Sequence, residues 1–189
     1  MKVKYIPNIL TVLRAVGAVG VIAIMFLADL ETTPALLYAG GLFLLCALTD
    51  MLDGNIARKH DVVSVFGQFV DPIADKFLIV GVLIAFLVVD HTDHRIMATC
   101  IIIIIARDFI ITSIRLMSAE RGIVVDANIW GKAKTVVQVI AICINFFAVW
   151  ARWSIFGKAA IIISTAVTVI SGIIYLKDFV KTFDKKQDK

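Results

Sequence analysis

The sequence has few of the residues that mark soluble or disulfide-bonded proteins. Charged residues make up only 18% of its 189 residues, it contains three prolines, and 60% of its residues are hydrophobic. A soluble domain is usually about 45–50% apolar and about 25% charged. Its three cysteines, Cys46, Cys100 and Cys143, stand alone in apolar stretches, so their spacing predicts neither a disulfide framework nor a zinc site. No Pro-, Gly- or Ser-rich linker divides the chain, so we expect a single domain over residues 1–189. We expect no nucleic-acid partner.

Long apolar runs are what the sequence has in abundance. A helix needs about 20 predominantly apolar residues to cross a bilayer core. Six stretches satisfy this, at roughly 8–28, 35–58, 66–89, 96–119, 130–151 and 156–178. The first run lacks a small-residue cleavage site, which favours a retained span over a signal peptide. The predicted fold class is therefore all-α, a polytopic integral membrane protein with six transmembrane helices.

Lysine and arginine are distributed unevenly between the two predicted sides of the membrane. An even number of spans places both termini on one side. Of the 19 basic residues, all but Arg95, Arg152 and Lys158 lie on that side or in span ends that open to it. Cytoplasmic segments carry the excess of basic residues in membrane proteins. We therefore expect both termini to be cytoplasmic, with the protein in contact with membrane lipids.

Two acidic runs interrupt the apolar pattern. Asp50 and Asp53 are three residues apart at the end of the second predicted span, and Asp71 and Asp75 are four apart at the start of the third. At these spacings each pair occupies one helix face. Small residues, which allow a backbone or a ligand to approach closely, continue the same faces: Gly54, Ala57 and Gly67. Because the connection between the two spans is short, the four carboxylates are predicted to meet at the cytoplasmic mouth.

Four neighbouring carboxylates at membrane depth need a physical explanation. They repel one another and cannot all ionise unaided. Oxygen ligands suit hard divalent cations such as Mg²⁺, Mn²⁺ or Ca²⁺, and paired metals recur in displacements at phosphorus. Asp75, one turn deeper than Asp71, is a candidate proton acceptor. Spacing alone leaves two alternatives open, an ion-transport pathway and a buried salt-bridge network with the basic residues Arg58, Lys76, Arg107 and Arg115.

Further polar residues gather on the cytoplasmic side of other predicted spans. The first span begins with Thr11 and Arg14, the fourth carries Arg107 and Arg115 in its second half, and the fifth begins near Lys132 and Lys134. Arginine binds phosphate with two parallel hydrogen bonds, whereas lysine acts as a point charge. These residues indicate a pocket for an anionic group. For each basic residue the alternative is a side chain that merely extends to the membrane surface.

The two acidic runs together resemble the signature of the CDP-alcohol phosphotransferase family. The pattern is Asp50-x2-Asp53-Gly54-x2-Ala57-Arg58-x8-Gly67-x3-Asp71-x3-Asp75, which has eight fixed positions over 26 residues. The resemblance implies a six-helix membrane enzyme that requires divalent cations. It also implies transfer of a phosphatidyl-type group from a CDP-linked donor to an alcohol, with release of CMP, and a homodimer.

Three other segments narrow the resemblance to the branch of the family that uses glycerol 3-phosphate. They are Pro7–Arg14, Ala106–Arg115 and Trp130–Thr135, and Asp108 stands where the resemblance leads us to expect glutamate. The implied substrates are CDP-diacylglycerol and sn-glycerol 3-phosphate, with two Mg²⁺ or Mn²⁺ ions. The implied location is the bacterial cell membrane, with the active site facing the cytoplasm. Another acceptor (inositol phosphate, serine or phosphatidylglycerol) is the alternative within the family, and a cation transporter is the alternative outside it.

The resemblance also implies roles for individual residues. The metal ligands are Asp50, Asp53, Asp71 and Asp75, and Asp75 is the general base. The residues that bind the CDP-linked donor are Asp50, Asp53, Gly54, Ala57, Arg58 and Gly67. The residues that bind the acceptor phosphate are Thr11, Arg14, Arg107, Arg115, Lys132 and Lys134.

Overall fold

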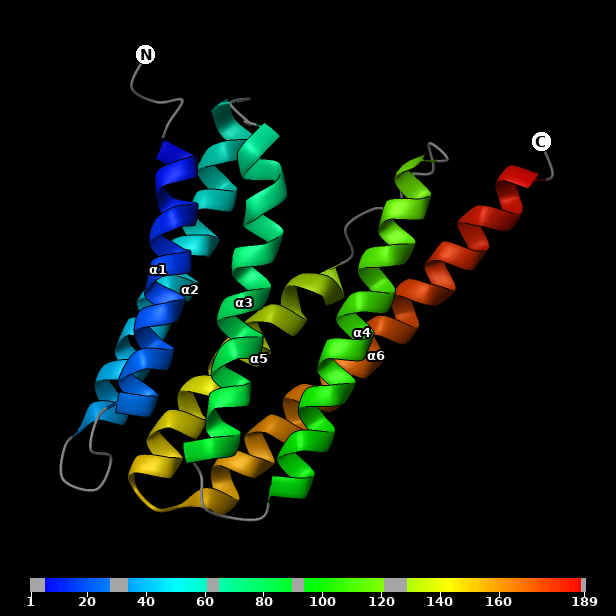
Figure 1. Ribbon diagram of the computed structural model, residues 1–189. Coiled ribbons are helices and arrows are strands. Elements are labelled where there is room, and N and C mark those ends of the chain that lie inside the picture. Colours follow the sequence, from blue (N-terminus) through cyan, green and yellow to red (C-terminus); the bar gives the residue numbers. More distant parts are fainter. Residues whose placement is uncertain (1–5, 28–33, 61–64, 90–93, 121–128, 188–189) are drawn as a thin grey trace.

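The computed structural model of the protein describes residues 6–27, 34–60, 65–89, 94–120 and 129–187. Side chains are described for residues 12–27, 34–49, 76–89, 94–118, 131 and 133–183. Over this part of the chain the fold is all-α, as predicted (Figure 1). The helices are α1 (Ile6–Leu27), α2 (Ala35–His60), α3 (Val65–Val89), α4 (His94–Glu120), α5 (Ile129–Trp150) and α6 (Ser154–Gln187).

Each predicted span coincides with one helix. The predicted ends agree to within two residues, except that α6 ends at Gln187 rather than at residue 178. At about 1.5 Å per residue, the 34 residues of α6 make it roughly 51 Å long, longer than a bilayer core is thick. The last turns of α6 therefore extend the helix beyond its apolar part.

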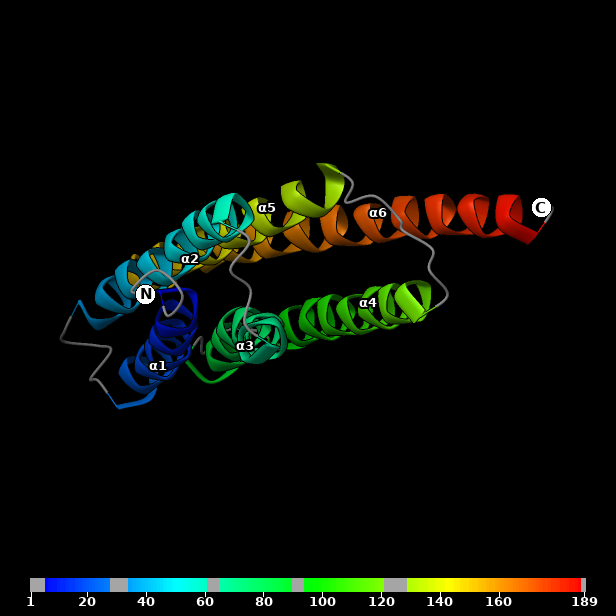
Figure 2. The same cartoon turned by 90° about the horizontal axis from the view of Figure 1, so that it is seen from above.

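The helices pack into a closed ring. The main contacts join α1 to α2, α2 to α5, α5 to α6, α6 to α4, α4 to α3, and α3 back to α1. Viewed from above, α2, α5 and α6 form one layer and α1, α3 and α4 form the other (Figure 2). The two helices that carry the acidic runs, α2 and α3, therefore flank α1. Their other neighbours are α5 and α4, the helices that carry Lys134 and Arg107.

Three phenylalanines from three helices form the centre of the apolar core. Phe86 of α3 meets Phe146 of α5 edge to face, with ring centroids 4.7 Å apart, and Phe43 of α2 lies 6.0 Å from Phe146. All three side chains are at most 2% exposed. On α3, Leu78 and Val82 precede Phe86 at four-residue intervals and are buried with it. This spacing places them on one helix face, so the sequence periodicity explains which side of α3 faces the core.

The outer surface of the bundle is largely apolar, as expected for a protein that lies in lipid. Large hydrophobic side chains on every helix are exposed. Three segments are long and apolar enough to cross a membrane: His94–Ser118, Ala133–Trp150 and Ser154–Phe183. The described parts of the other helices contain the shorter apolar segments Val12–Leu27, Ala35–Thr49 and Lys76–Val89. The structure therefore supports a membrane protein, while six complete spans and the cytoplasmic termini stay predictions.

A tight turn joins α5 to α6 at the predicted boundary. Arg152 has a positive φ of 59°, the left-handed conformation that often ends a helix. The Trp153 amide donates to the Ala148 carbonyl at 2.7 Å, and the Arg152 amide donates to the Val149 carbonyl at 3.2 Å. These bonds satisfy the last carbonyls of α5 and reverse the chain. As a result α6 packs back along α5.

Candidate active site

The two acidic runs lie in helical backbone at the same end of the bundle. Asp50 and Asp53 belong to the later turns of α2, and Asp71 and Asp75 belong to the first turns of α3. The predicted helical spacing of each acidic pair is therefore confirmed for the backbone. The end of α2 and the start of α3 both lie at the top of the bundle in Figure 1, but they belong to opposite layers in Figure 2. Among the described residues the two helices have no extensive packing contact with each other, so the expected meeting of the four carboxylates stays a prediction.

The side chains of the whole signature lie outside the described residues. This applies to Asp50, Asp53, Gly54, Ala57, Arg58, Gly67, Asp71 and Asp75, and also to Thr11 and Lys132. The four predicted metal ligands are all carboxylates, and carboxylate oxygens suit a hard divalent cation better than zinc. Among the described side chains, no group of three or more His, Cys, Asp or Glu residues offers another metal site. The assignment of the four aspartates as metal ligands stays a prediction.

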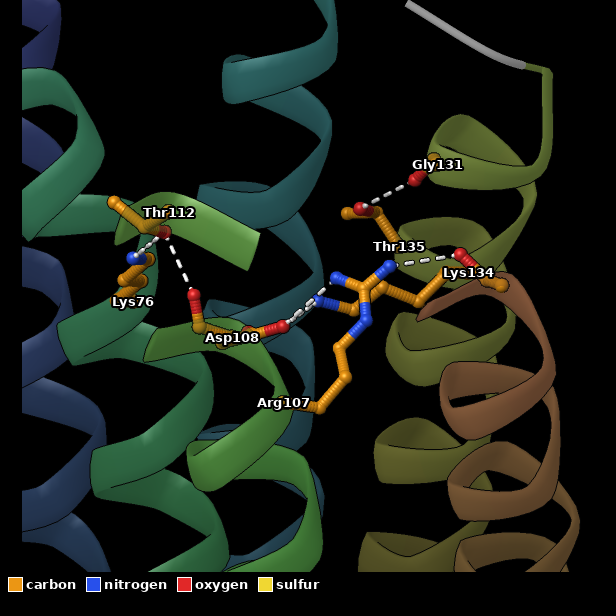
Figure 3. Close-up of polar contacts among 8 residues, drawn as sticks. Lys76, Arg107, Asp108, Thr112, Gly131, Lys134 and Thr135 are labelled. Atoms are coloured by element: carbon orange, nitrogen blue, oxygen red, sulfur yellow. Dashed lines mark hydrogen bonds and ion pairs between the residues drawn. The ribbon is translucent and has the colours of Figure 1, made fainter. Parts of the chain in front are cut away.

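A cluster of charged residues connects α4 to α5 inside the bundle. One carboxylate oxygen of Asp108, Oδ1, accepts hydrogen bonds from Arg107 Nη1 at 3.1 Å and from Lys134 Nζ at 2.5 Å (Figure 3). The side chains of Arg107, Asp108 and Lys134 are only 14%, 15% and 10% exposed. Ionised groups that are this well buried are costly unless they pair, and each of the two cations has the Asp108 carboxylate as its partner.

Residues of α6 complete the surroundings of Arg107. Its Nη2 donates to Ser171 Oγ at 2.8 Å. The neighbouring Gly172 has no side chain, and a Cβ placed there would lie 3.1 Å from Arg107 Cγ and 3.2 Å from Arg107 Nε. The side chain of Arg107 therefore lies directly against the backbone of α6. The sequence alone does not indicate this role, because residues 156–178 form one long apolar run in which Ser171-Gly172 is only a small interruption.

Arg115 lies apart from this cluster. It follows Asp108 by seven residues and so occupies the same face of α4, about two turns nearer the helix end. Its guanidinium carbon is 5.8 Å from the ring centroid of Tyr175 on α6, in a cation–π contact. Tyr175 is buried, whereas Arg115 is exposed. The structure thus holds Arg115 on an aromatic ring while leaving it accessible to an anion.

A second polar contact joins α3 to α4 beside the acidic run. Lys76, the residue after Asp75, donates from Nζ to Thr112 Oγ1 at 2.7 Å, and Thr112 donates in turn to the Asp108 carbonyl at 2.7 Å (Figure 3). The Lys76 ammonium also lies 5.9 Å from the ring centroid of Phe109. These contacts join α3 to α4 one residue beyond Asp75.

The described residues bring together part of the predicted acceptor pocket. Arg107 and Lys134 meet on Asp108, and Arg115 lies on Tyr175. Arg14 is buried on α1 at 3% exposure. Because α1 packs between α2 and α3, Arg14 belongs to the side of the ring that carries the acidic runs. Phosphate binding by these side chains stays a prediction.

Comparison with known proteins gives a consistent result over most of the chain. Residues 4–170 match the CDP-alcohol phosphatidyltransferase family. A CDP-diacylglycerol–glycerol-3-phosphate 3-phosphatidyltransferase of Mycoplasma pneumoniae is 31% identical, with 97% of this chain and 91% of the relative covered. Proteins of the same name from Bacillus subtilis and Rickettsia felis are 37% and 34% identical. The first alignment covers 72% of this chain and 74% of the relative, and the second covers 95% and 98%.

Proposed function

The chain belongs to the CDP-alcohol phosphatidyltransferase family, and from this premise we propose that it makes phosphatidylglycerophosphate. It transfers the phosphatidyl group of CDP-diacylglycerol to sn-glycerol 3-phosphate and releases CMP. The observation that carries this proposal is the similarity, over nearly the full length of both chains, to enzymes named for that reaction. The complete acidic signature in α2 and α3 supplies the residues that the reaction needs.

The four aspartates hold divalent cations. Enzymes of this family generally depend on such cations, and we propose two Mg²⁺ or Mn²⁺ ions here. When bound, such ions would neutralise the negative charge of the donor pyrophosphate and of the departing CMP. Asp50, Asp53 and Asp71 would hold them, with Asp75 contributing to the second ion.

The donor binds beside these carboxylates. Gly54 and Ala57 leave room for the cytidine, Arg58 holds the nucleotide, and Gly67 lets the donor approach α3. Helical backbone at these positions supports the proposal, because it places the small residues of α2 on the faces that carry the aspartates.

Asp75 acts as the general base. It takes the proton of the glycerol 1-hydroxyl while that oxygen forms a bond to the β-phosphorus of the donor. The bond between the β-phosphorus and the oxygen that bridges to the α-phosphate breaks, and CMP leaves with the electron pair. The contact of the adjacent Lys76 with Thr112 joins α3 to α4 next to this residue.

The acceptor's phosphate binds to the basic residues of α4 and α5. Arg115 is the first contact, because its guanidinium is exposed and held on Tyr175. Lys134 and Arg107 supply positive charge about two turns deeper, balanced in part by Asp108. Thr11, Arg14 and Lys132 complete the set of proposed contacts. A phosphate dianion suits such a site because charge-assisted hydrogen bonds are the strongest that side chains offer.

A location at the cytoplasmic edge of a bacterial cell membrane serves both substrates. The acyl chains of the donor stay in lipid while its headgroup meets a water-soluble acceptor. We propose six spans, both termini in the cytoplasm, one domain over residues 1–189, and a homodimer. The excess of basic residues on the terminal side supports this orientation.

An acceptor panel tests the function directly. The purified protein, in detergent with CDP-diacylglycerol and Mg²⁺ or Mn²⁺, is offered glycerol 3-phosphate, inositol phosphate, serine or phosphatidylglycerol. We expect CMP release with glycerol 3-phosphate alone. Release with a different acceptor would move the chain to another branch of its family. If no acceptor supports release, cation flux in liposomes would favour transport.

A further inference from the structure

The basic residues of α4 are held from behind by α6. Arg107 reaches α6 at Ser171 and Gly172, and Arg115 reaches it one turn further along at Tyr175. Ser171 is 1% exposed and Tyr175 is 7% exposed, so these contacts are within the bundle. Helix α6 packs against both α4 and α5, the two helices that carry the proposed phosphate-binding residues.

The two α6 residues at Arg107 act in different ways. Ser171 Oγ accepts the Nη2 hydrogen bond at 2.8 Å and so fixes the rotation of the guanidinium plane. With Nη2 held by Ser171, Nη1 faces Asp108 at 3.1 Å. Gly172 allows the stem of Arg107 to lie close to the α6 backbone, because any Cβ would meet Arg107 Cγ and Nε at 3.1–3.2 Å. Ser171 therefore sets the orientation of the guanidinium, and Gly172 sets how closely the Arg107 side chain approaches the α6 backbone.

The position of Arg107 in turn affects Lys134. Both cations bond to the same oxygen of Asp108, so a displaced guanidinium changes the charge balance and the position of the carboxylate that Lys134 contacts. Networks of buried charges respond as a unit rather than as separate pairs. A small shift at α6 therefore reaches a proposed phosphate-binding lysine on α5.

We propose that Ser171 and Gly172 are positioning residues for the acceptor site, which act through Arg107 on the Asp108–Lys134 pair. This inference rests on the proposed function, since it assigns the cluster to the phosphate of the acceptor. Neither residue touches the substrate. Their substitution is expected to weaken acceptor binding and to leave donor binding unchanged.

The test measures KM for both substrates in two variants and two controls. Ser171→Ala removes the hydroxyl, and Gly172→Ala pushes the Arg107 stem outward by a few tenths of an ångström. The matched controls are Ser164→Ala, a buried serine two turns earlier on α6, and Gly41→Ala, where a Cβ has no neighbour within 4 Å. We expect KM for glycerol 3-phosphate to rise about tenfold in both test variants, the size of effect that one hydrogen bond to a charged group produces. We expect KM for CDP-diacylglycerol to stay within about twofold.

A double-mutant cycle separates positioning from general destabilisation. Ser171→Ala is repeated in an Arg107→Lys background, in which the guanidinium that contacts both Asp108 and Ser171 is already lost. If Ser171 acts through Arg107, its substitution has almost no further effect on the acceptor KM there. An equal effect in both backgrounds overturns the proposal. The proposal is also overturned if the KM values of both substrates change by a similar factor. It is overturned as well if the Ser171→Ala and Gly172→Ala proteins have an unchanged KM for the acceptor.

Failure of this inference can be told apart from failure of the proposed function. If the wild-type protein uses another acceptor, the proposed function is wrong, and the same KM comparison is made with the acceptor it does use. If Ser171→Ala does not yield folded protein, Gly172→Ala carries the test, because it displaces Arg107 without removing a hydrogen bond. A folded Gly172→Ala protein with wild-type KM for its acceptor then overturns the proposal.

Discussion

Replacing Asp108 with asparagine tests the charged cluster most sharply. The substitution keeps the shape of the side chain and an acceptor oxygen but removes the negative charge that Arg107 and Lys134 share. Both cations are at most 14% exposed, so water cannot replace the lost charge. Breaking a buried pair by removing one partner costs about 3–5 kcal/mol. Because the amide still accepts hydrogen bonds, we expect a loss near the lower limit, about 3 kcal/mol.

The matched variant is Asp108→Glu, which keeps the charge and adds one methylene group. Glutamate is also the residue that the family resemblance leads us to expect at this position. We expect its stability to stay within about 1 kcal/mol of the wild type. The free energy of unfolding can be measured for each protein in mixed detergent micelles by circular dichroism as the denaturing detergent is increased.

A Lys134→Met substitution completes a double-mutant cycle with Asp108→Asn. The single Lys134→Met variant leaves Arg107 as the partner of Asp108, and the double variant removes both charges of the Asp108–Lys134 ion pair. We expect the double variant to be more stable than the sum of the single losses predicts, by at least about 1 kcal/mol. Losses that add within about 0.5 kcal/mol, or an Asp108→Asn protein as stable as Asp108→Glu, would refute the reasoning.

Three further predictions concern the chemistry and the core. Asp75→Asn should lower turnover by about 10²–10⁴-fold while donor binding stays measurable, as expected for loss of a general base; near-normal turnover rules out that role. Arg115→Ala should raise KM for glycerol 3-phosphate by about 10–100-fold with little change for the donor, and an unchanged acceptor KM removes Arg115 from the pocket. Phe146→Ala should lower the free energy of unfolding by about 3 kcal/mol, since it removes the ring that contacts both Phe43 and Phe86, and a loss below about 1 kcal/mol contradicts that account of the core.

The helices were predictable from the sequence because long apolar runs are a strong and simple signal. Apolar length alone located six helices to within two residues at all but one end. The exception, the C-terminal end of α6, carries Lys177, Asp178 and Lys181 and then further charged residues. Hydropathy falls there, although nothing in the local sequence breaks the helix. An apolar count finds the part of a helix that lies in lipid, not the point where the helix stops.

The order of the helices around the ring could not be predicted in the same way. Six apolar helices of similar length can pack in many orders, and exposed apolar faces in lipid give no preference among them. The contacts of Arg107 with α6 and of Lys134 with Asp108 depend on that order. The pairing of Arg107 with Asp108 was within reach because the two residues are adjacent on α4. The partnership with Ser171, 64 residues away, was not.

The location of the basic residues gives the protein's proposed substrate preference a physical basis. An uncharged alcohol would offer these cations no anionic group to bind. Here α4 and α5 carry three basic side chains that are held by Asp108, Ser171 and Tyr175. Basic side chains held in place in this way are expected where the acceptor carries a phosphate group and the cations that bind it must keep their positions.

The most direct test of the proposed reaction follows a radioactive label on the acceptor into the product. The purified full-length protein is supplied with CDP-diacylglycerol, Mg²⁺ and glycerol 3-phosphate labelled with carbon-14. We predict that label enters a chloroform-soluble lipid in an amount equal to the CMP released. A chelator is expected to stop both, and added Mg²⁺ or Mn²⁺ is expected to restore both. Label that remains in the aqueous phase with either cation present, while CMP is not formed, would contradict the proposed reaction.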